Sequence, residues 1–481
     1  AETSSILRYI CYNGVRYVRW GIIKMKKTND YGKDPIPVLV LKTSVPFMLA
    51  QLVNVLYSIV DRIYVGNIPV IGADSLAGAG VCAPIITLLS SFGTLVGIGG
   101  SVLFSVRLGA GDEKMARRIL ANSFSLLLIL SAALTVVFLL TKDQLLHWFG
   151  ASEVTFPYAD TYLTIYTLGT FFALLSMGMN YFITAQGYPG LGMMTTLIGA
   201  VVNIVLDPVF IFLFHMNIAG AAVATVIAQM SSCVFVLATL RTKKMRIPLG
   251  IVKPEADIGK RIVKIGFSPF LILATDSVII IAMNAVLQHY GGKEYGDTLI
   301  TAVTIVQSYM LLITSPMLGI TGGSQPLISY NYGANRPDRI RGTIFWALML
   351  CLCFTTLMFV LSRTAAHIFV RIFTDNAEYT ELAVWGIRAF TLMIIPLSFQ
   401  YVFVDGLTAL GMTRTSLTLS LIRKTIYLGA TCVLPLLAAA ESAFYAEPLA
   451  DGCAAVLSCV VFSCIYRKYL KGEGRLSEIR I

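Results

Sequence analysis

The first half of this 481-residue chain holds two carboxylic acids inside long apolar stretches, Asp61 and Asp207. An ionisable side chain within a lipid bilayer costs several kcal/mol, so such a residue is a functional candidate. Two neighbouring carboxylates in a low-dielectric site cannot both ionise cheaply unless a proton or a cation lies between them. We therefore interpret the two acids as part of an ion-binding site.

Helical spacing adds oxygen atoms around both acids. Asn54, Tyr57 and Asp61 fall on one helical face at steps of three and four residues, and Asn203 lies one turn before Asp207. The hydroxyl group of Thr225, in the following apolar segment, lies at a similar depth. We predict a site for H⁺ or Na⁺, which hard oxygen ligands can hold, at four residues: Asp61, Asn203, Asp207 and Thr225.

An alternative interpretation needs no ion. Asp61 then lies near the water interface beside Arg62, and Asp207 caps a backbone break that Pro208 introduces. Further polar and flexible side chains are candidates for cavity or substrate contacts, although the methionine suits an ordinary core equally well. These candidates are Asn54, Tyr57, Met177, Asn180 and Asp276.

The second half has its own intramembrane charges. Asp276 lies near mid-membrane and could attract a cationic substrate. Asp405 and Arg423 lie toward the same side of adjacent apolar segments, where they form either an ion pair or part of a substrate site. No metal-ligand spacing joins the nine Cys residues to His, so we expect no cofactor beyond the coupling ion.

The composition identifies the elements that must position these residues. The chain is 56% hydrophobic and 13% charged, with mean hydropathy +0.76, far from the values of a water-soluble domain. About 20 apolar residues span a bilayer as a helix, and the segments are too long and too evenly apolar for a β-barrel. We predict twelve membrane helices at 36–66, 75–107, 116–140, 155–185, 190–214, 218–240, 259–289, 297–330, 340–362, 379–409, 415–438 and 447–468.

The Lys and Arg residues between these segments alternate by side. One side receives 28 of them, and the other receives only Lys142, Lys293, Arg363 and Arg371. The positive-inside rule therefore predicts that both termini are cytoplasmic. The same alternation explains the formal net charge of +11 without a nucleic-acid partner.

Met25 is the first methionine, so we expect the natural start there and an upstream extension over 1–24.

The sequence repeats itself at a shift of 223 or 224 residues. Pro46-Phe47 aligns with Pro269-Phe270, and Gly109-Ala110 aligns with Gly333-Ala334. Six spans separate equivalent points, so the halves share one orientation and an axis along the membrane normal relates them. We predict an all-α protein of two parallel six-helix bundles, with segments 1–35 (cytoplasmic), 36–240 (first lobe), 241–258 (linker), 259–470 (second lobe) and 471–481 (cytoplasmic tail).

The repeat also separates the two lobes by chemistry. Asp61 aligns with Asn284, and Asp207 aligns with Thr431, so the equivalent places in the second lobe are neutral. Ion coupling is therefore expected in the first lobe.

Five motifs carry a family resemblance: SIVDRIYVG at 58–66, GIGGS at 97–101, AQG at 185–187, NIVLDP at 203–208 and YNYGA at 330–334. With them, nearly all of the chain from Tyr31 onward resembles the multidrug and toxic compound extrusion (MATE) family. Within this family, the chain looks most like the bacterial and archaeal branch that is similar to DNA-damage-inducible protein F.

The resemblance implies two six-helix bundles arranged as a V, in a multi-pass inner-membrane protein that exports organic cations in exchange for H⁺ or Na⁺. In this branch the ion site comprises residues that correspond here to Asp61, Asn203, Asp207 and Thr225, with Tyr57 and Asn180 at nearby motif positions. Another branch has an acidic site in the second lobe, but here Gln400 stands where one of its acids would be.

We therefore expect an antiporter of cationic or amphipathic small molecules, acting as a monomer in the bilayer. The first alternative is a lipid-linked oligosaccharide flippase of the wider superfamily, which usually has fourteen spans and a basic lumen. The second is a membrane-embedded enzyme, although the spans contain no His-Glu-x-x-His or Gly-x-Ser-x-Gly arrangement.

Overall fold

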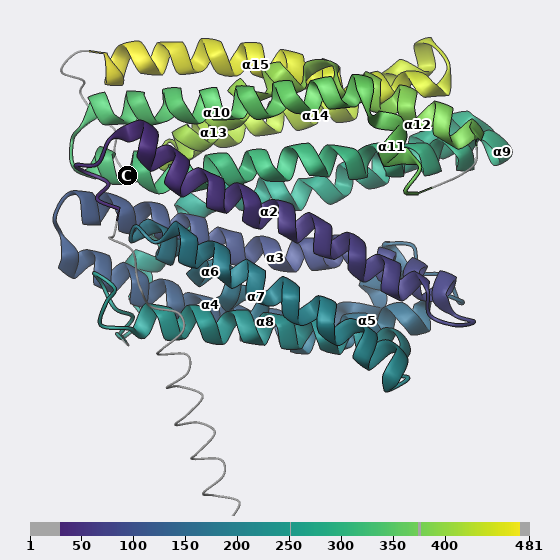
Figure 1. Ribbon diagram of the computed structural model, residues 1–481, viewed down its shortest axis with the longest axis horizontal. Helices are drawn as coiled ribbons and strands as arrows, with labels where there is room; N and C mark the ends of the chain where they lie inside the picture. The colour runs from purple at the N-terminus through teal and green to yellow at the C-terminus, as the bar shows by residue number, and fades with distance from the viewer. Residues whose placement is uncertain (1–28, 251, 374–376, 472–481) are drawn as a thin grey trace, which may run out of the picture.

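The computed structural model describes residues 29–250, 252–373 and 377–471, and these contain helices and no strand. The helices are numbered as in Figure 1. Their bounds are α2 Ile36–Gly66, α3 Gly72–Gly109, α4 Glu113–Trp148, α5 Phe156–Leu168, α6 Thr170–Ala185, α7 Pro189–Pro208, η1 Val209–Leu213, α8 Asn217–Arg241, α9 Ala256–Gly333, α10 Pro337–Thr364, α11 Ala366–Val370, α12 Ala377–Phe390, η2 Thr391–Met393, α13 Ile394–Ala409, α14 Thr413–Leu437, η3 Ala440–Tyr445, α15 Ala446–Ile465 and η4 Tyr466–Leu470.

The described helices form twelve spans, as the sequence predicts. Eleven are continuous enough to cross a membrane, and α5 with α6 makes a twelfth that bends by 55° around Gly169. The long α9 is two spans joined at Gly292, whose φ of 73° lies in the left-handed region that glycine adopts without strain. The chain is thus an all-α, multi-pass membrane protein.

The spans pack into two lobes, drawn in purple to teal and in green to yellow in Figure 1. The first lobe has one continuous apolar core, whereas the second has two, one of which lies around α12 and η3. α2 lies along the boundary between the lobes in this view.

The first span of each half packs partly into the other half. Leu39 and Val40 of α2 belong to the apolar core of the second lobe. Reciprocally, Ile258, Ile262 and Ile265 of α9 belong to the core of the first lobe. This exchange follows the sequence repeat, and it means that a movement between the lobes must also move α2 and α9.

Two glycines allow a close approach between the halves. A Cβ on Gly109 would collide with the backbone of Tyr330, and a Cβ on Gly333 would collide with the backbone of Val106. Both partners are related by the same shift of 224 residues as the glycines themselves. These contacts therefore lie close to the pseudo-symmetry axis, and small residues are what permits them.

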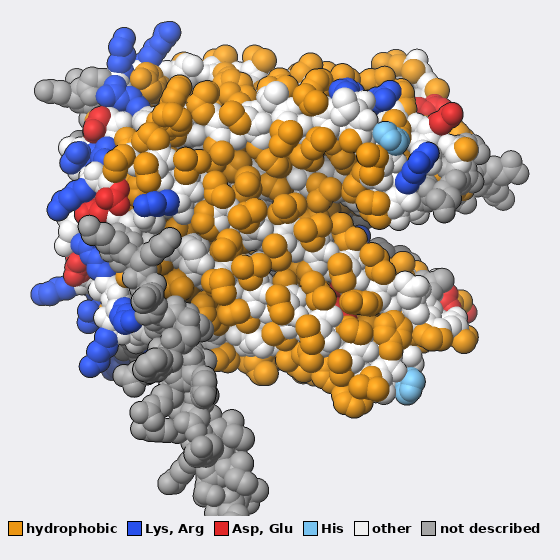
Figure 2. Space-filling view, in the orientation of Figure 1, with side chains coloured by type: hydrophobic (Ala, Val, Ile, Leu, Met, Phe, Trp, Pro, Cys, Tyr) orange, Lys and Arg blue, Asp and Glu red, His pale blue; other side chains and the backbone are white. Residues whose placement is uncertain are grey.

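The two ends of the molecule differ in charge and in shape. Figure 2 shows Lys and Arg side chains gathered at one end, where the lobes touch, and a cleft between the lobes at the opposite end. The lobes are therefore closed at the basic end and open at the other. The expected extension over 1–24 lies outside the described residues.

Candidate functional site

The predicted acids meet inside the first lobe. The second half of α2 carries Asp61 and packs against α7, which carries Asp207 near its end. Asp207 is fully buried, and its carboxyl group lies next to the carboxyl group of Asp61, which is half-buried. One proton or one cation can therefore bridge the two groups. α7 ends immediately afterwards at Pro208, and a π-helical turn follows.

Asn203 organises the remaining ligands. Its Nδ2 donates to Asp207 Oδ1 at 3.1 Å and to Thr225 Oγ1 of α8 at 3.3 Å. Asn203 is itself 2% exposed, so these bonds are formed away from the surface. The structure thus brings together all four residues that were predicted to bind the ion.

Several buried oxygen atoms of this cluster have no hydrogen-bond donor in the described chain. They are Asp61 Oδ1, Asp207 Oδ2, Asn203 Oδ1 and Gln229 Oε1. Buried polar atoms are nearly always paired, so a group of unpaired ones calls for an explanation such as a bound ion or water. Acceptors without donors are the groups that a proton or Na⁺ would satisfy, so the residues present fit either ion.

Three residues of this site were missed by sequence reasoning. Tyr162 and Tyr166 of α5 have stacked rings 6.5 Å apart, and Tyr162 lies near Asp61. Gln229 of α8 donates to the Tyr166 hydroxyl at 3.2 Å. The available signal was the spacing of four residues between the tyrosines and between Thr225 and Gln229, which places each pair on one helical face.

Two of the other predicted residues lie on α2. Tyr57 is half-buried and lies within electrostatic range of Asp61 and Asp207. Asn54 instead donates to Gln51 Oε1 of its own helix at 3.0 Å.

Asn180 and Met177 lie on α6, away from the acids. Asn180 Nδ2 donates to the carbonyl of Gly192 at 3.2 Å, in the first turn of α7, whereas Asp207 is in its last turn. At 1.5 Å per residue that separation is about 22 Å. Met177 Sδ contacts the Thr94 hydroxyl on α3 at 3.9 Å. Neither residue belongs to the Asp61 and Asp207 cluster.

In the second lobe, two alternatives were open for Asp405 and Arg423, and the structure contradicts the ion pair between them. Arg423 instead donates to two acids of α15, Glu447 and Asp451, each at 2.7 Å. Helix α14 turns this guanidinium toward α15, whereas Asp405 lies near Thr321 of α9.

Asp276 is also paired, because Lys424 donates to its carboxylate. Its side chain is 42% exposed. A substrate cation would therefore compete with Lys424 for this carboxylate.

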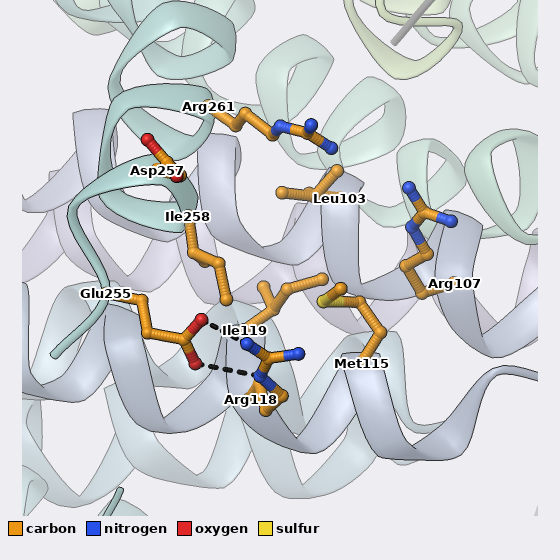
Figure 3. Close-up of a pocket in the computed structure, with 9 residues that line it drawn as sticks. All are labelled: Leu103, Arg107, Met115, Arg118, Ile119, Glu255, Asp257, Ile258 and Arg261. Atoms are coloured by element: carbon orange, nitrogen blue, oxygen red, sulfur yellow. Dashed lines mark hydrogen bonds and ion pairs between the residues drawn. The ribbon is translucent and has the colours of Figure 1, made fainter. Parts of the chain in front are cut away.

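A separate cavity of about 210 Å³ lies at the basic end (Figure 3). The ion pair between Arg118 and Glu255 closes one side of it and holds the pKa of the Glu255 carboxyl below its ordinary value of 4.5. The cavity is far from the acid cluster and lies between α3, α4 and the start of α9. Its lining residues are Leu103, Arg107, Met115, Arg118, Ile119, Glu255, Asp257, Ile258 and Arg261.

Known proteins resemble this chain over most of its length. The family model described as MatE matches residues 46–209 and 271–429. The multidrug export protein MepA of Staphylococcus haemolyticus is 26% identical over 446 residues, which cover 91% of this chain and 95% of that protein. The protein of the same name from Staphylococcus aureus strain MSSA476 is 25% identical over 403 residues, covering 82% and 86%.

Solved structures share the fold. One described as the outward-facing conformation of a multidrug resistance MATE family transporter of the MOP superfamily has a TM-score of 0.83 at 20% identity, covering 92% of this chain and 100% of that chain. A MOP superfamily transporter from Pyrococcus furiosus, described as having a binding pocket of reverse polarity, has a TM-score of 0.85 at 21% identity, covering 92% and 99%.

Proposed function

Because this chain belongs to the MatE family, whose members are transporters and not enzymes, we propose that it is an antiporter that exports cationic or amphipathic small molecules in exchange for H⁺ or Na⁺. Two relatives, both multidrug export proteins by name, support the substrate class. The family assignment removes the membrane-embedded enzyme from consideration. The finer branch within the family stays a prediction.

The observation that carries this proposal is the pairing of the half-buried Asp61 with the fully buried Asp207, beside Asn203 and Thr225. Two neighbouring carboxyl groups largely shielded from water favour a neutralising ion between them. Among the described residues, no hydrogen-bond donor reaches Asp61 Oδ1, Asn203 Oδ1, Asp207 Oδ2 or Gln229 Oε1. Such a set binds a proton or Na⁺ reversibly, which is what a coupling site must do.

The charge distribution supports the direction of transport. In our proposal the basic end faces the cytoplasm, with both termini and the linker between the lobes, by the positive-inside rule. The cleft in Figure 2 then opens to the outside. We infer that an ion enters from the outside, neutralises Asp61 and Asp207, and weakens the hold on a cationic substrate in the cleft.

The return movement then releases the ion into the cytoplasm. The membrane potential supplies about 2.3 kcal/mol for each charge moved through 100 mV. Each lobe has an apolar core of its own, so a single chain supplies both walls of the cleft. We therefore propose that the protein acts as a monomer.

The test is efflux of a fluorescent organic cation from vesicles that contain the purified protein. A proton gradient and a Na⁺ gradient are imposed separately on wild type and on Asp207→Asn. We expect one gradient to drive efflux in wild type and Asp207→Asn to abolish that response. The effective gradient identifies the ion.

Asp338→Asn is the matched control, because Asp338 is an exposed acid at the basic end. It should retain gradient-driven efflux. If Asp207→Asn also retains it, the coupling site is wrong. Efflux that ignores both gradients would favour the flippase of the wider superfamily.

A further inference from the structure

The second lobe contains a buried charge cluster that the proposed function does not use. Arg423 of α14 donates through Nε to Asp451 Oδ1 and through Nη2 to Glu447 Oε1, each at 2.7 Å. The Asp451 side chain is 0% exposed, and those of Glu447 and Arg423 are each 11% exposed. All three lie within membrane-spanning helices.

The charges of this cluster do not balance. One guanidinium faces two carboxylates, which leaves one negative charge buried if both acids are ionised. The neighbouring pair of Lys424 and Asp276 is neutral by itself and supplies no surplus cation. An uncompensated charge in the interior is strongly unfavourable, so the cluster requires one more positive charge.

The free atom of the cluster is Asp451 Oδ2, which is buried and has no hydrogen-bond donor in the described chain. A proton on this oxygen converts the carboxylate into a neutral acid while Oδ1 keeps its bond from Arg423. A metal ion fits less well, because the guanidinium repels it. Among the described residues, no group of three His, Cys, Asp or Glu side chains could hold a metal.

We propose that Asp451 is a second proton-binding site, which lies in the second lobe and is separate from Asp61 and Asp207. The proton arrives from water, forms an O–H bond at Oδ2, and returns to water when the bond breaks. This site is unrelated to the repeat, since the second-lobe counterparts of Asp61 and Asp207 are the neutral Asn284 and Thr431.

Other polar groups face this cluster from three helices. Tyr427 of α14 lies against Glu447, and Tyr401 of α13 lies within electrostatic range of both acids. Lys424 is also within range of the two acids and contacts the partly exposed Asp276. A partly exposed ion pair thus lies within electrostatic range of the buried acid.

The test is infrared difference spectroscopy of the full-length protein in lipid during a pH titration. A protonated carboxyl group has its own C=O band, which shifts when H₂O is replaced by D₂O. The background is Asp61→Asn with Asp207→Asn, which removes both acids of the proposed coupling site. We expect this double variant to keep a titrating carboxyl band, and Asp451→Asn in the same background to lose it.

An unchanged band after Asp451→Asn would overturn the proposal. Carboxyl-¹³C aspartate in the double variant provides a second measurement that does not depend on the folding of an Asp451 variant. The band should shift with labelled aspartate, whereas a shift with labelled glutamate alone would assign the proton to Glu447 and contradict the proposal.

A role of Asp451 in transport rests on the proposed function, but the infrared test does not. If the protein is an H⁺ antiporter, Asp451→Asn should lower the number of protons exchanged per substrate by one. Failure of antiport would appear in the efflux assay with Asp207→Asn, and failure of this inference would appear in the infrared spectrum.

Discussion

The phenol of Tyr31 donates a hydrogen bond to the backbone carbonyl of Thr184, with 2.5 Å between the two oxygen atoms. The backbone carbonyl of Tyr31 accepts bonds from Asn331 at 3.2 Å and from Arg339 at 2.9 Å. The segment before α2 thereby connects α6 of the first lobe to α9 and α10 of the second. Burial raises the pKa of the Tyr31 phenol, so the donor proton stays in place at neutral pH.

Tyr31→Phe should weaken closure of the basic end. It removes one hydrogen bond, worth about 0.5–1.5 kcal/mol, and keeps the edge-to-face packing on Tyr330. We expect a larger fraction of molecules open at this end, measured as a longer distance between spin labels at Lys114 and Asp338. Tyr188→Phe is the control, because its bond to the Lys244 carbonyl does not join the lobes.

Gly266→Ala should prevent full closure of the same end. The added Cβ would collide with the backbone of Leu95 on α3, which cannot move aside as a flexible side chain could. Overpacking of this kind typically costs about 1–3 kcal/mol. The spin-label distance should lengthen and efflux should fall. Gly259→Ala, on the same helix with nothing within 4 Å of its Cβ position, should change neither.

Thr225→Val should weaken ion binding, and Thr225→Ser should preserve it. Valine keeps the shape of threonine but loses the hydroxyl that accepts from Asn203 at 3.3 Å. The loss of a hydrogen bond worth about 0.5–1.5 kcal/mol corresponds to a decrease in affinity of up to about tenfold. The affinity is measured as the concentration of the driving ion that gives half-maximal efflux. Equal concentrations for Thr225→Val and Thr225→Ser would contradict the prediction.

Arg423→Gln should destabilise the second lobe strongly, because it leaves Glu447 and Asp451 without their guanidinium. Removing one partner of a buried ion pair costs about 3–5 kcal/mol. Adding Asp451→Asn should restore part of the thermal stability by removing one uncompensated charge. Arg388→Gln, at an exposed position of α12, should have little effect on the unfolding temperature. No rescue by Asp451→Asn would count against the ionic interpretation.

Glu255 should stabilise the linker only when it is ionised. Its pKa is below the ordinary 4.5 in the folded protein, because Arg118 donates to it. Its contribution is therefore complete above pH 4.5 and is lost as the pH falls through the lower, folded-state pKa. Glu255→Gln should lower the unfolding temperature at neutral pH, and the difference from wild type should vanish in acid. Asp257→Asn, without this bond, serves as control.

The candidate site could be predicted from spacing alone only where its residues share a helix. Asn203 and Asp207, one turn apart, are an example, and the depth of the spans brought Asp61 and Thr225 to the same level. The partners of Arg423 could not be found this way. Glu447 and Asp451 stand at the start of the last span, and the rotation of α14 about its own axis decides which acid Arg423 meets.

The sequence by itself determined the membrane class, the twelve spans and the two-fold repeat, because apolar length and internal similarity are properties of the chain in one dimension. The tertiary structure alone decided the exchange of α2 and α9 between the lobes and the break at Gly169. It also placed Tyr162 and Tyr166 beside the acids and Arg423 against α15. These features depend on how helices rotate and cross, and packing between residues far apart in the sequence determines that.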